Sequence, residues 1–239
     1  MKKLKMFRKG IRVVDMSQSL RRSDNLKFTD LLFKRVSVLW DNEVNNDFIV
    51  QMAKGVLDIE RFKNYLMQDY FYLLDYLDIL KKLKNMCVHD SLFNHLDKMI
   101  KETMHETYSV HVPYMNRVGI TQKEIFNCKI ELVIKDYISY IKSVIEEHTI
   151  LGGVIALFQC SWGYAYVSEK AWKLYGNDEH SVYKDWFDAY STGSYIDANQ
   201  DWIDLINEMT RFLDTDQAEI LCDIFVKCAQ FENQFWNVL

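Results

Sequence analysis

The stretch between Glu147 and Glu169 contains no Asp, Glu, Lys or Arg, and its apolar residues fall on every side of a helical wheel. A helix that is apolar all round is surrounded by protein or by lipid, and an uncharged run of about 20 residues is long enough to span a bilayer. Gln159, Ser161 and three glycines make this stretch a poor membrane segment. We therefore predict the central helix of a soluble all-α domain, and no association with a membrane.

The chain of 239 residues contains one proline and eight glycines. This scarcity of helix breakers favours long helices with short connections over a many-stranded sandwich. A net charge of −5 gives no general attraction for nucleic acid, so we predict no nucleic-acid partner. Five cysteines without a C-x-x-C pair are typical of a reducing compartment, which predicts a cytoplasmic protein.

The first 24 residues are basic and lack the apolar core of a signal peptide. We predict that residues 1–24 form a disordered extension with no part in the chemistry, and that residues 25–239 form a single all-helical domain. Hydrophobic periodicity and cap residues predict helices over 28–45, 47–54, 58–84, 90–112, 131–147 and 195–213. A capping box at 121–124 opens a further helix, and the uncharged central helix ends near 175–176. Another helix holds Tyr183, Trp186 and Tyr190, and the last helix begins at 214 or 215 and ends near Trp236. Pro113 is expected to end the fourth of these helices.

Two carboxylates interrupt apolar stripes on different predicted helices. Asp69 has tyrosines and leucines as its i±3 and i±4 neighbours, and Glu232 has Cys228, Ala229, Phe235 and Trp236, with Phe225 two turns earlier. An unpaired buried charge costs several kcal/mol, so each acid must find donors. For Asp69, a structural hydrogen bond to tyrosine hydroxyls and a polar anchor in a ligand pocket both remain open. Burial would raise the pKa of Glu232 toward the range useful for proton transfer.

The uncharged helix places Cys160 and Tyr164 on one face, because they stand four residues apart. A buried cysteine is ordinarily inert packing, so this pair alone does not indicate catalysis. Glu102 and His105 have the Glu-x-x-His spacing of di-metal helix bundles, but the second copy that such sites need is missing. We interpret Glu102 and His105 as a solvated face and His111 as a packed histidine, and we predict no metal site.

Three segments resemble the TenA (thiaminase II) family. They are LDIERF with YLMQDYFYL at 57–73, ALFQCSWGY at 156–164 and FENQFW at 231–236, and they occur in the family's order and spacing. The resemblance covers the chain from about Phe28 to its end. It implies a heme-oxygenase-like helical bundle, no cofactor, a small pyrimidine as partner and a homotetramer.

Residue by residue, the resemblance implies a nucleophile at Cys160 and an acid/base at Glu232. It implies that Asp69 binds the exocyclic amine of the pyrimidine. The other implied substrate-binding residues are Tyr72, Tyr137, Tyr164, Tyr190 and Phe235. The sequence departs from the family pattern at 46–48, at Ser161 and Gly163, and at 191–195. These departures affect substrate preference, pocket size and subunit contacts.

The activity implied is hydrolysis of 4-amino-5-aminomethyl-2-methylpyrimidine, and of thiamin, to 4-amino-5-hydroxymethyl-2-methylpyrimidine in thiamin salvage. In this mechanism Glu232 protonates a ring nitrogen while Cys160 adds to a ring carbon. Cys160 must then have a lowered pKa or lose its proton during the attack. Two alternatives stay open: a non-catalytic pyrimidine-binding protein, and a metal-dependent oxygenase that uses Glu102 and His105.

Overall fold

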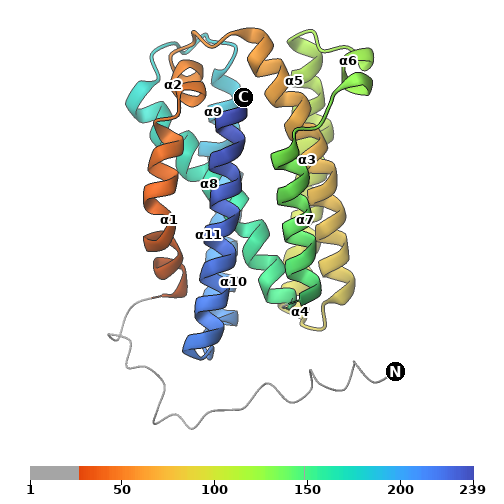
Figure 1. Ribbon diagram of the computed structural model, residues 1–239, viewed down its shortest axis with the longest axis vertical. Helices are drawn as coiled ribbons and strands as arrows, with labels where there is room; N and C mark the ends of the chain where they lie inside the picture. Colours follow the sequence, from red (N-terminus) through yellow and green to blue (C-terminus); the bar gives the residue numbers. More distant parts are fainter. Residues whose placement is uncertain (1–26, 148) are drawn as a thin grey trace.

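A computed structural model describes residues 27–147 and 149–239, and every regular element in these ranges is a helix (Figure 1). In chain order the elements are α1 (Phe28–Val44), α2 (Asp47–Ala53), α3 (Ile59–Met86), α4 (Asp90–His105), the π-helix η2 (Glu106–His111), α5 (Val112–Arg117), α6 (Gln122–Asn127), α7 (Leu132–Glu147), α8 (Ile150–Tyr175), α9 (Lys184–Ser191), α10 (Gly193–Met209) and α11 (Thr215–Val238). The predicted all-α class is confirmed. The predicted extension over 1–24 lies outside the described residues.

The uncharged stretch forms α8, which passes through the middle of the bundle (Figure 1). It contacts α1, α2, α3, α7, α9, α10 and α11. By length and composition α8 could cross a membrane, but 72% of its most apolar window is buried inside the protein. This burial is what the core helix of a bundle shows, as the sequence predicted.

Several helices begin and end where local chemistry predicts. The Asp58 carboxylate accepts from the backbone N–H groups of Glu60 and Arg61 and so caps α3, and Asp214 caps α11. After α2, Gly55 adopts a φ of 73°, the left-handed conformation that glycine takes at helix ends. These caps fix the starts of two helices that carry site residues.

The predicted helix end at Pro113 is wrong, because the helical path continues from α4 through η2 to Arg117. Pro113 lies in the first turn of α5, where a helix does not need the missing N–H. The predicted helix over 195–213 also differs from α10, which begins at Gly193 and ends at Met209. Gly193 begins this helix with a φ of 51°, a conformation that glycine adopts readily.

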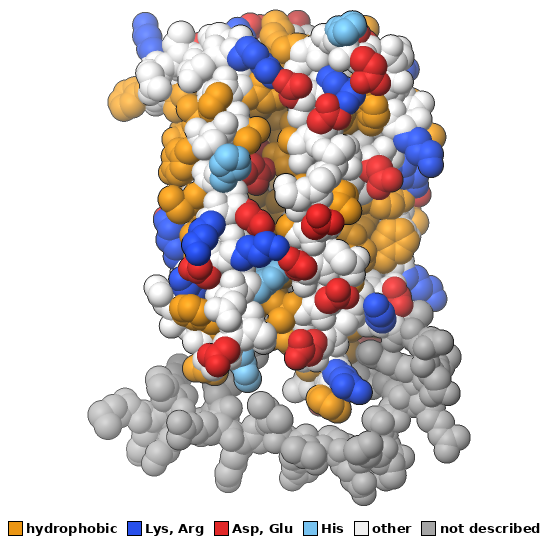
Figure 2. Space-filling model, turned by 180° about the vertical axis from the view of Figure 1, so that it is seen from behind, with side chains coloured by type: hydrophobic (Ala, Val, Ile, Leu, Met, Phe, Trp, Pro, Cys, Tyr) orange, Lys and Arg blue, Asp and Glu red, His pale blue; other side chains and the backbone are white. Residues whose placement is uncertain are grey.

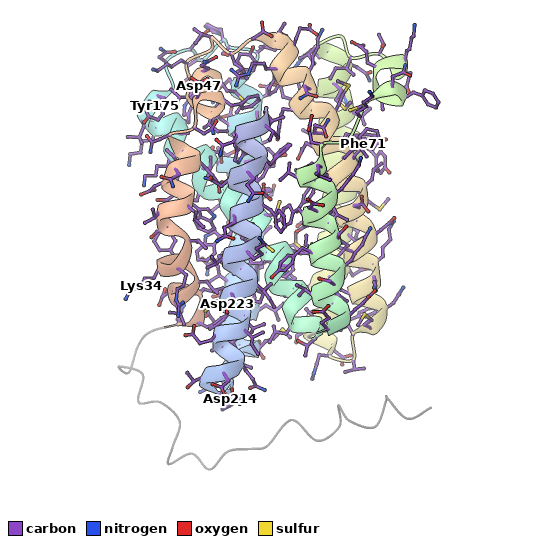
Figure 3. The ribbon with its side chains drawn as sticks, in the orientation of Figure 1. Lys34, Asp47, Phe71, Tyr175, Asp214 and Asp223 are labelled. Atoms are coloured by element: carbon purple, nitrogen blue, oxygen red, sulfur yellow. The ribbon has the colours of Figure 1, made fainter. Side chains whose placement is uncertain are left out.

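The long helix α11 carries its C-terminal half toward the end of the bundle where α2 begins. Figure 3 shows Asp214 at one end of the bundle and both Asp47 and Tyr175 at the other. The Asn46 side-chain amide donates to Asn237 at 2.9 Å and so joins α11 to the start of α2. Glu232 therefore lies beside the middle of α8 rather than at a chain end.

Close packing of α8 against α3 and α7 depends on Gly153. A Cβ atom at this position would lie 2.7 Å from Ile145 Cγ1 and 2.8 Å from Leu83 Cδ2. We expect Gly153→Ala to lower the free energy of unfolding by about 1–2 kcal/mol, since overpacking outweighs the better helix propensity of alanine. Chemical denaturation measures this change. An unchanged or raised free energy of unfolding would show that the contact is loose.

Candidate active site

The eight residues that the sequence singled out line one buried pocket, which we call the inner pocket. It consists of two adjoining cavities that share Asp69, Tyr72 and Tyr164. Cys160 and Tyr190 line the first cavity; Tyr137, Glu232 and Phe235 line the second. Cys160 and Tyr164 come from α8, Asp69 and Tyr72 from α3, and Glu232 and Phe235 from α11. Three helices thus bring a thiol and two carboxyl groups together.

Asp69 lies in the inner pocket with one oxygen free of hydrogen bonds. The Tyr164 hydroxyl donates to Oδ1 at 3.4 Å, whereas the buried Oδ2 has no hydrogen-bond partner. Burial raises the pKa of Asp69 to about 7, and hydrogen bonds from tyrosines oppose this rise. An unpartnered buried oxygen is costly unless something occupies it. The hydrogen bond from Tyr164 agrees with the first interpretation of Asp69, and its role as an anchor for a ligand stays a prediction.

His111 approaches Asp69 without supplying a positive charge. Its Nε2 lies 2.8 Å from the Leu66 carbonyl oxygen, and since a carbonyl only accepts, Nε2 carries the proton. Nδ1 is then unprotonated and lies 3.5 Å from Asp69 Oδ2. Burial lowers the pKa of His111, so the ring stays neutral. His111 is a packed histidine, as predicted, and leaves Asp69 without a cation.

Cys160 and Glu232 interact across the inner pocket. Burial raises the pKa of Glu232 to about 8, and hydrogen bonding from the Cys160 thiol and the Tyr137 hydroxyl opposes the rise. Burial and then the nearby Glu232 charge raise the pKa of Cys160 well above its usual value. Of the two options for Cys160, the raised pKa does not favour a pre-formed thiolate, and no Lys or Arg is among the described residues that line the inner pocket. The thiol must pass its proton to a base during attack.

Aromatic rings form the walls of the inner pocket. Tyr72 and Tyr137 stack with centroids 5.5 Å apart, and Tyr137 stacks in turn on Phe231 at 5.2 Å. Tyr164, which also lines the pocket, meets Tyr190 edge to face at 5.0 Å. Such walls suit a flat aromatic ligand that slides between them. The first cavity measures about 40 Å³ and the second about 10 Å³, room for a few water molecules, so a bound ring would need the pocket walls to move apart.

A second, larger cavity lies outside the inner pocket and is called the outer groove here. It measures about 820 Å³ and is lined by residues of α4, η2, α5, α9 and α10. Figure 2 shows a hollow along the middle of the rear face, where acidic side chains lie close to apolar ones. The inner pocket and the outer groove share Met99, Thr103, Glu106, Ser161, Tyr190 and Tyr195. These shared residues form the neck between the two spaces.

Sequence reasoning missed two carboxylates that the structure places near the pocket. Glu106 lies in the neck and accepts a hydrogen bond from the Tyr190 hydroxyl at 2.8 Å. Glu43, on α1, is 2% exposed, and burial and the nearby Glu232 charge raise its pKa well above its usual value. Glu43 follows Leu39 and Trp40 at i−4 and i−3, so the criterion that found Asp69 applies to it in part. Glu106 has mostly polar neighbours along its helix, so that criterion would not have found it.

The structure gives no support to the metal-dependent alternative. Glu102 lies 3.8 Å from the Lys98 amine, and His105 is exposed. Within residues 27–147 and 149–239, no group of three or more His, Cys, Asp or Glu side chains gathers in a way that could hold a metal ion. The interpretation of Glu102 and His105 as a solvated face agrees with their surroundings.

The sequence is similar to a known protein family and to characterised members of it. The sequence model of the TENA/THI-4/PQQC family matches residues 33–239. The chain is 24% identical over 214 residues to the aminopyrimidine aminohydrolase of Helicobacter pylori, covering 89% of this chain and 98% of the relative. It is 25% identical to the aminopyrimidine aminohydrolase of Halalkalibacterium halodurans, with coverage of 89% and 95%.

The fold matches solved structures over the same part of the chain. A TenA homologue from P. horikoshii superposes with a TM-score of 0.79 at 21% identity, covering 89% of this chain and 97% of that one. At this identity the similarity shows the fold alone. It confirms the bundle that the sequence predicted.

Proposed function

The chain belongs to the TENA/THI-4/PQQC family, and from this membership and the inner pocket we propose that it is an enzyme, a hydrolase of the thiaminase II type. Its substrate would be an aminomethyl-pyrimidine derived from thiamin, and its product the corresponding hydroxymethyl-pyrimidine. A thiol and two carboxyl groups that line one aromatic-walled pocket carry this proposal. The tetrameric state and the cytoplasmic location stay predictions.

The polar atoms of the inner pocket complement an aminopyrimidine. Its exocyclic amine donates hydrogen bonds, and Asp69 Oδ2 is a buried acceptor without a partner. A ring nitrogen accepts, and Glu232, with its pKa raised to about 8, holds a proton at neutral pH. Glu232 Oε1 also lacks a partner. A ring held between the two acids would satisfy both unpartnered oxygens and lie between the tyrosine walls.

The covalent step follows from the raised pKa of both groups. Glu232 gives its proton to the ring nitrogen and takes the proton of the Cys160 thiol, while the sulfur forms a bond to a ring carbon. The electron pair of the exocyclic amine then moves through the ring and breaks the bond between the methylene carbon and the leaving group. Asp69 stabilises the positive charge that this leaves on the exocyclic amine.

Water completes the reaction and restores the enzyme. Water adds to the methylene carbon and loses one proton, which forms the hydroxymethyl group. The bond between sulfur and ring carbon then breaks, and its electron pair returns to sulfur. The proton on the ring nitrogen goes back through Glu232 to Cys160. Covalent addition thus divides one difficult displacement into easier steps.

Turnover of two compounds tests the proposal. Purified protein is incubated with the aminomethyl-pyrimidine and, separately, with thiamin, and release of hydroxymethyl-pyrimidine is followed by chromatography. We expect release from at least the first compound. Folded protein that releases no product from either would reject the proposal. Tight pyrimidine binding without release would instead indicate the non-catalytic binding protein.

The pKa values of the two acids predict a narrow pH optimum. Below about 7, protonation of Asp69 weakens its hold on the positively charged amine, so kcat/KM falls with acid. Above about 8, Glu232 loses the proton that the ring nitrogen needs, so kcat/KM falls with alkali. We expect kcat/KM for the aminomethyl-pyrimidine to be highest between these values. A profile without either decline from about pH 6 to 9 would contradict these assignments.

A further inference from the structure

We propose that Glu106 binds the amine leaving group of the substrate at the neck of the inner pocket and keeps it protonated as it departs. This inference rests on the proposed function and extends it to a residue that recognises the part of the substrate outside the pyrimidine ring. It assigns the enzyme to substrates with a small amine on the exocyclic methylene.

The position of Glu106 places it between the reacting centre and the outer groove. It lines the same cavity as Cys160 and also lines the outer groove. Of the six residues that the two spaces share, Glu106 is the one with a charged side chain. A pyrimidine ring whose nitrogen meets Glu232 would have its far edge toward the first cavity, which Cys160 and Glu106 line, and would direct its exocyclic methylene there. The leaving group then reaches the neck.

The π-helical turn η2 begins at Glu106, where α4 ends. Single π-turns inside helices are rare and are frequently found at functional sites. Within this turn Thr107 and His111 are buried, and the Thr107 hydroxyl donates to the Thr103 carbonyl at 2.7 Å. The buried Thr107 and His111 anchor the turn that begins at Glu106. The Tyr190 hydroxyl donates to the Glu106 carboxylate and so holds this side chain in place.

The carboxyl group of Glu106 is not paired with a cation, and burial raises its pKa to about 7, so it can both hold and release a proton at neutral pH. Other carboxylates of the outer groove have cationic partners: Asp185 lies 2.6 Å from Arg117, and Asp188 pairs with Lys184. Among the described residues, Glu106 forms no ion pair and accepts only from a neutral tyrosine hydroxyl. Half-buried next to a small cavity, it can bind a small ammonium group, which donates up to three hydrogen bonds.

The proton balance of amine release runs through this carboxylate. Glu106 gives one proton to the amine, which is held as ammonium beside the carboxylate. When the bond between methylene carbon and nitrogen breaks, its electron pair goes to nitrogen, which leaves as neutral ammonia. The water that adds to the methylene carbon releases its proton to solvent once the bond between carbon and oxygen has formed, with either substrate. Glu106 takes up one proton from solvent before the next neutral amine binds.

Thiamin carries a different leaving group at the position that Glu106 would contact. Its leaving group is a positively charged thiazolium nitrogen, which departs as a neutral thiazole when it takes the electron pair of the broken bond. No proton is needed for this departure. Loss of a group that keeps the leaving nitrogen protonated should therefore slow amine release far more than thiazole release.

Glu106→Gln tests the proposal with both substrates. We expect kcat for the aminomethyl-pyrimidine to fall about 100-fold or more, the usual size of general acid–base catalysis. We expect kcat for thiamin to change by less than about threefold, even if KM rises through loss of the negative charge. Tyr190→Phe removes the hydrogen bond to Glu106. It should lower kcat for the aminomethyl-pyrimidine by a smaller factor than Glu106→Gln does, and it should again affect kcat for thiamin less.

Glu102→Gln is the matched control, because Glu102 lies one turn earlier beside Lys98 and outside the neck. It should leave both rates near those of the unmodified protein. Equal loss of both activities in Glu106→Gln, or no loss in either, would overturn the inference while the proposed function stands. Absence of turnover in the unmodified protein would instead overturn the proposed function.

Discussion

Cys160→Ala is expected to lower kcat for hydrolysis of the aminomethyl-pyrimidine by about 10,000-fold or more, because removal of a nucleophile leaves only the residual rate that binding provides. The change removes one sulfur atom from a side chain that is only partly buried, so the fold should persist. Turnover of purified protein at saturating substrate, with circular dichroism as a check of folding, measures the effect.

Cys87→Ala is the control for that experiment. Cys87 lies at the end of α3, outside the inner pocket, and its thiol donates to the His89 carbonyl at 3.4 Å. This variant should retain nearly the full rate. If Cys160→Ala also keeps a rate within about tenfold of the unmodified protein, sulfur does not bond to the ring and the covalent step is wrong.

The second large effect concerns Glu232. We expect Glu232→Gln to lower kcat by about 100-fold to 10,000-fold, because an amide of the same shape can neither give a proton to the ring nitrogen nor take one from the thiol. Binding of hydroxymethyl-pyrimidine should weaken far less than turnover, since the side-chain volume is kept. Steady-state kinetics and equilibrium binding, measured side by side, separate the two effects.

Glu43→Gln offers a matched comparison, because Glu43 is a second buried glutamate close to Glu232 that does not line the inner pocket. Burial and the nearby Glu232 charge raise the pKa of Glu43 and so favour its neutral form, which glutamine replaces with little change of shape. We expect a rate near that of the unmodified protein. If Glu43→Gln lowered kcat strongly and Glu232→Gln only slightly, Glu43 rather than Glu232 would be the acid/base.

Much of the fold could be predicted because local chemistry determines it. The uncharged stretch required a protein environment on every side, and the structure provides one around α8. Asp58 and Asp214 begin their helices as their side chains indicate. The π-turn η2 could not be predicted, because its hydrogen-bond shift has no marker in composition or periodicity, and Pro113 in the next helix gave the opposite indication.

The candidate site could be predicted in part for a related reason. A carboxylate in an apolar stripe, such as Asp69 or Glu232, signals an unusual environment from sequence alone. The pKa of Cys160 could not be inferred in this way, because it depends on how deeply other helices bury the thiol and which charges they bring near it. Burial raises this pKa most, Glu232 raises it further, and none of the described pocket residues is a Lys or Arg. Glu106 could not be identified from the sequence, because its position in the neck between two cavities arises only from tertiary packing.

The structure of the protein with bound hydroxymethyl-pyrimidine would test the central claim most directly. We expect the ring in the inner pocket, with its exocyclic amine within hydrogen-bond distance of Asp69, a ring nitrogen at the same distance from Glu232, and a ring carbon in contact with the Cys160 sulfur. A ring bound in the outer groove, or one in the inner pocket that touches only one of these three side chains, would contradict the account.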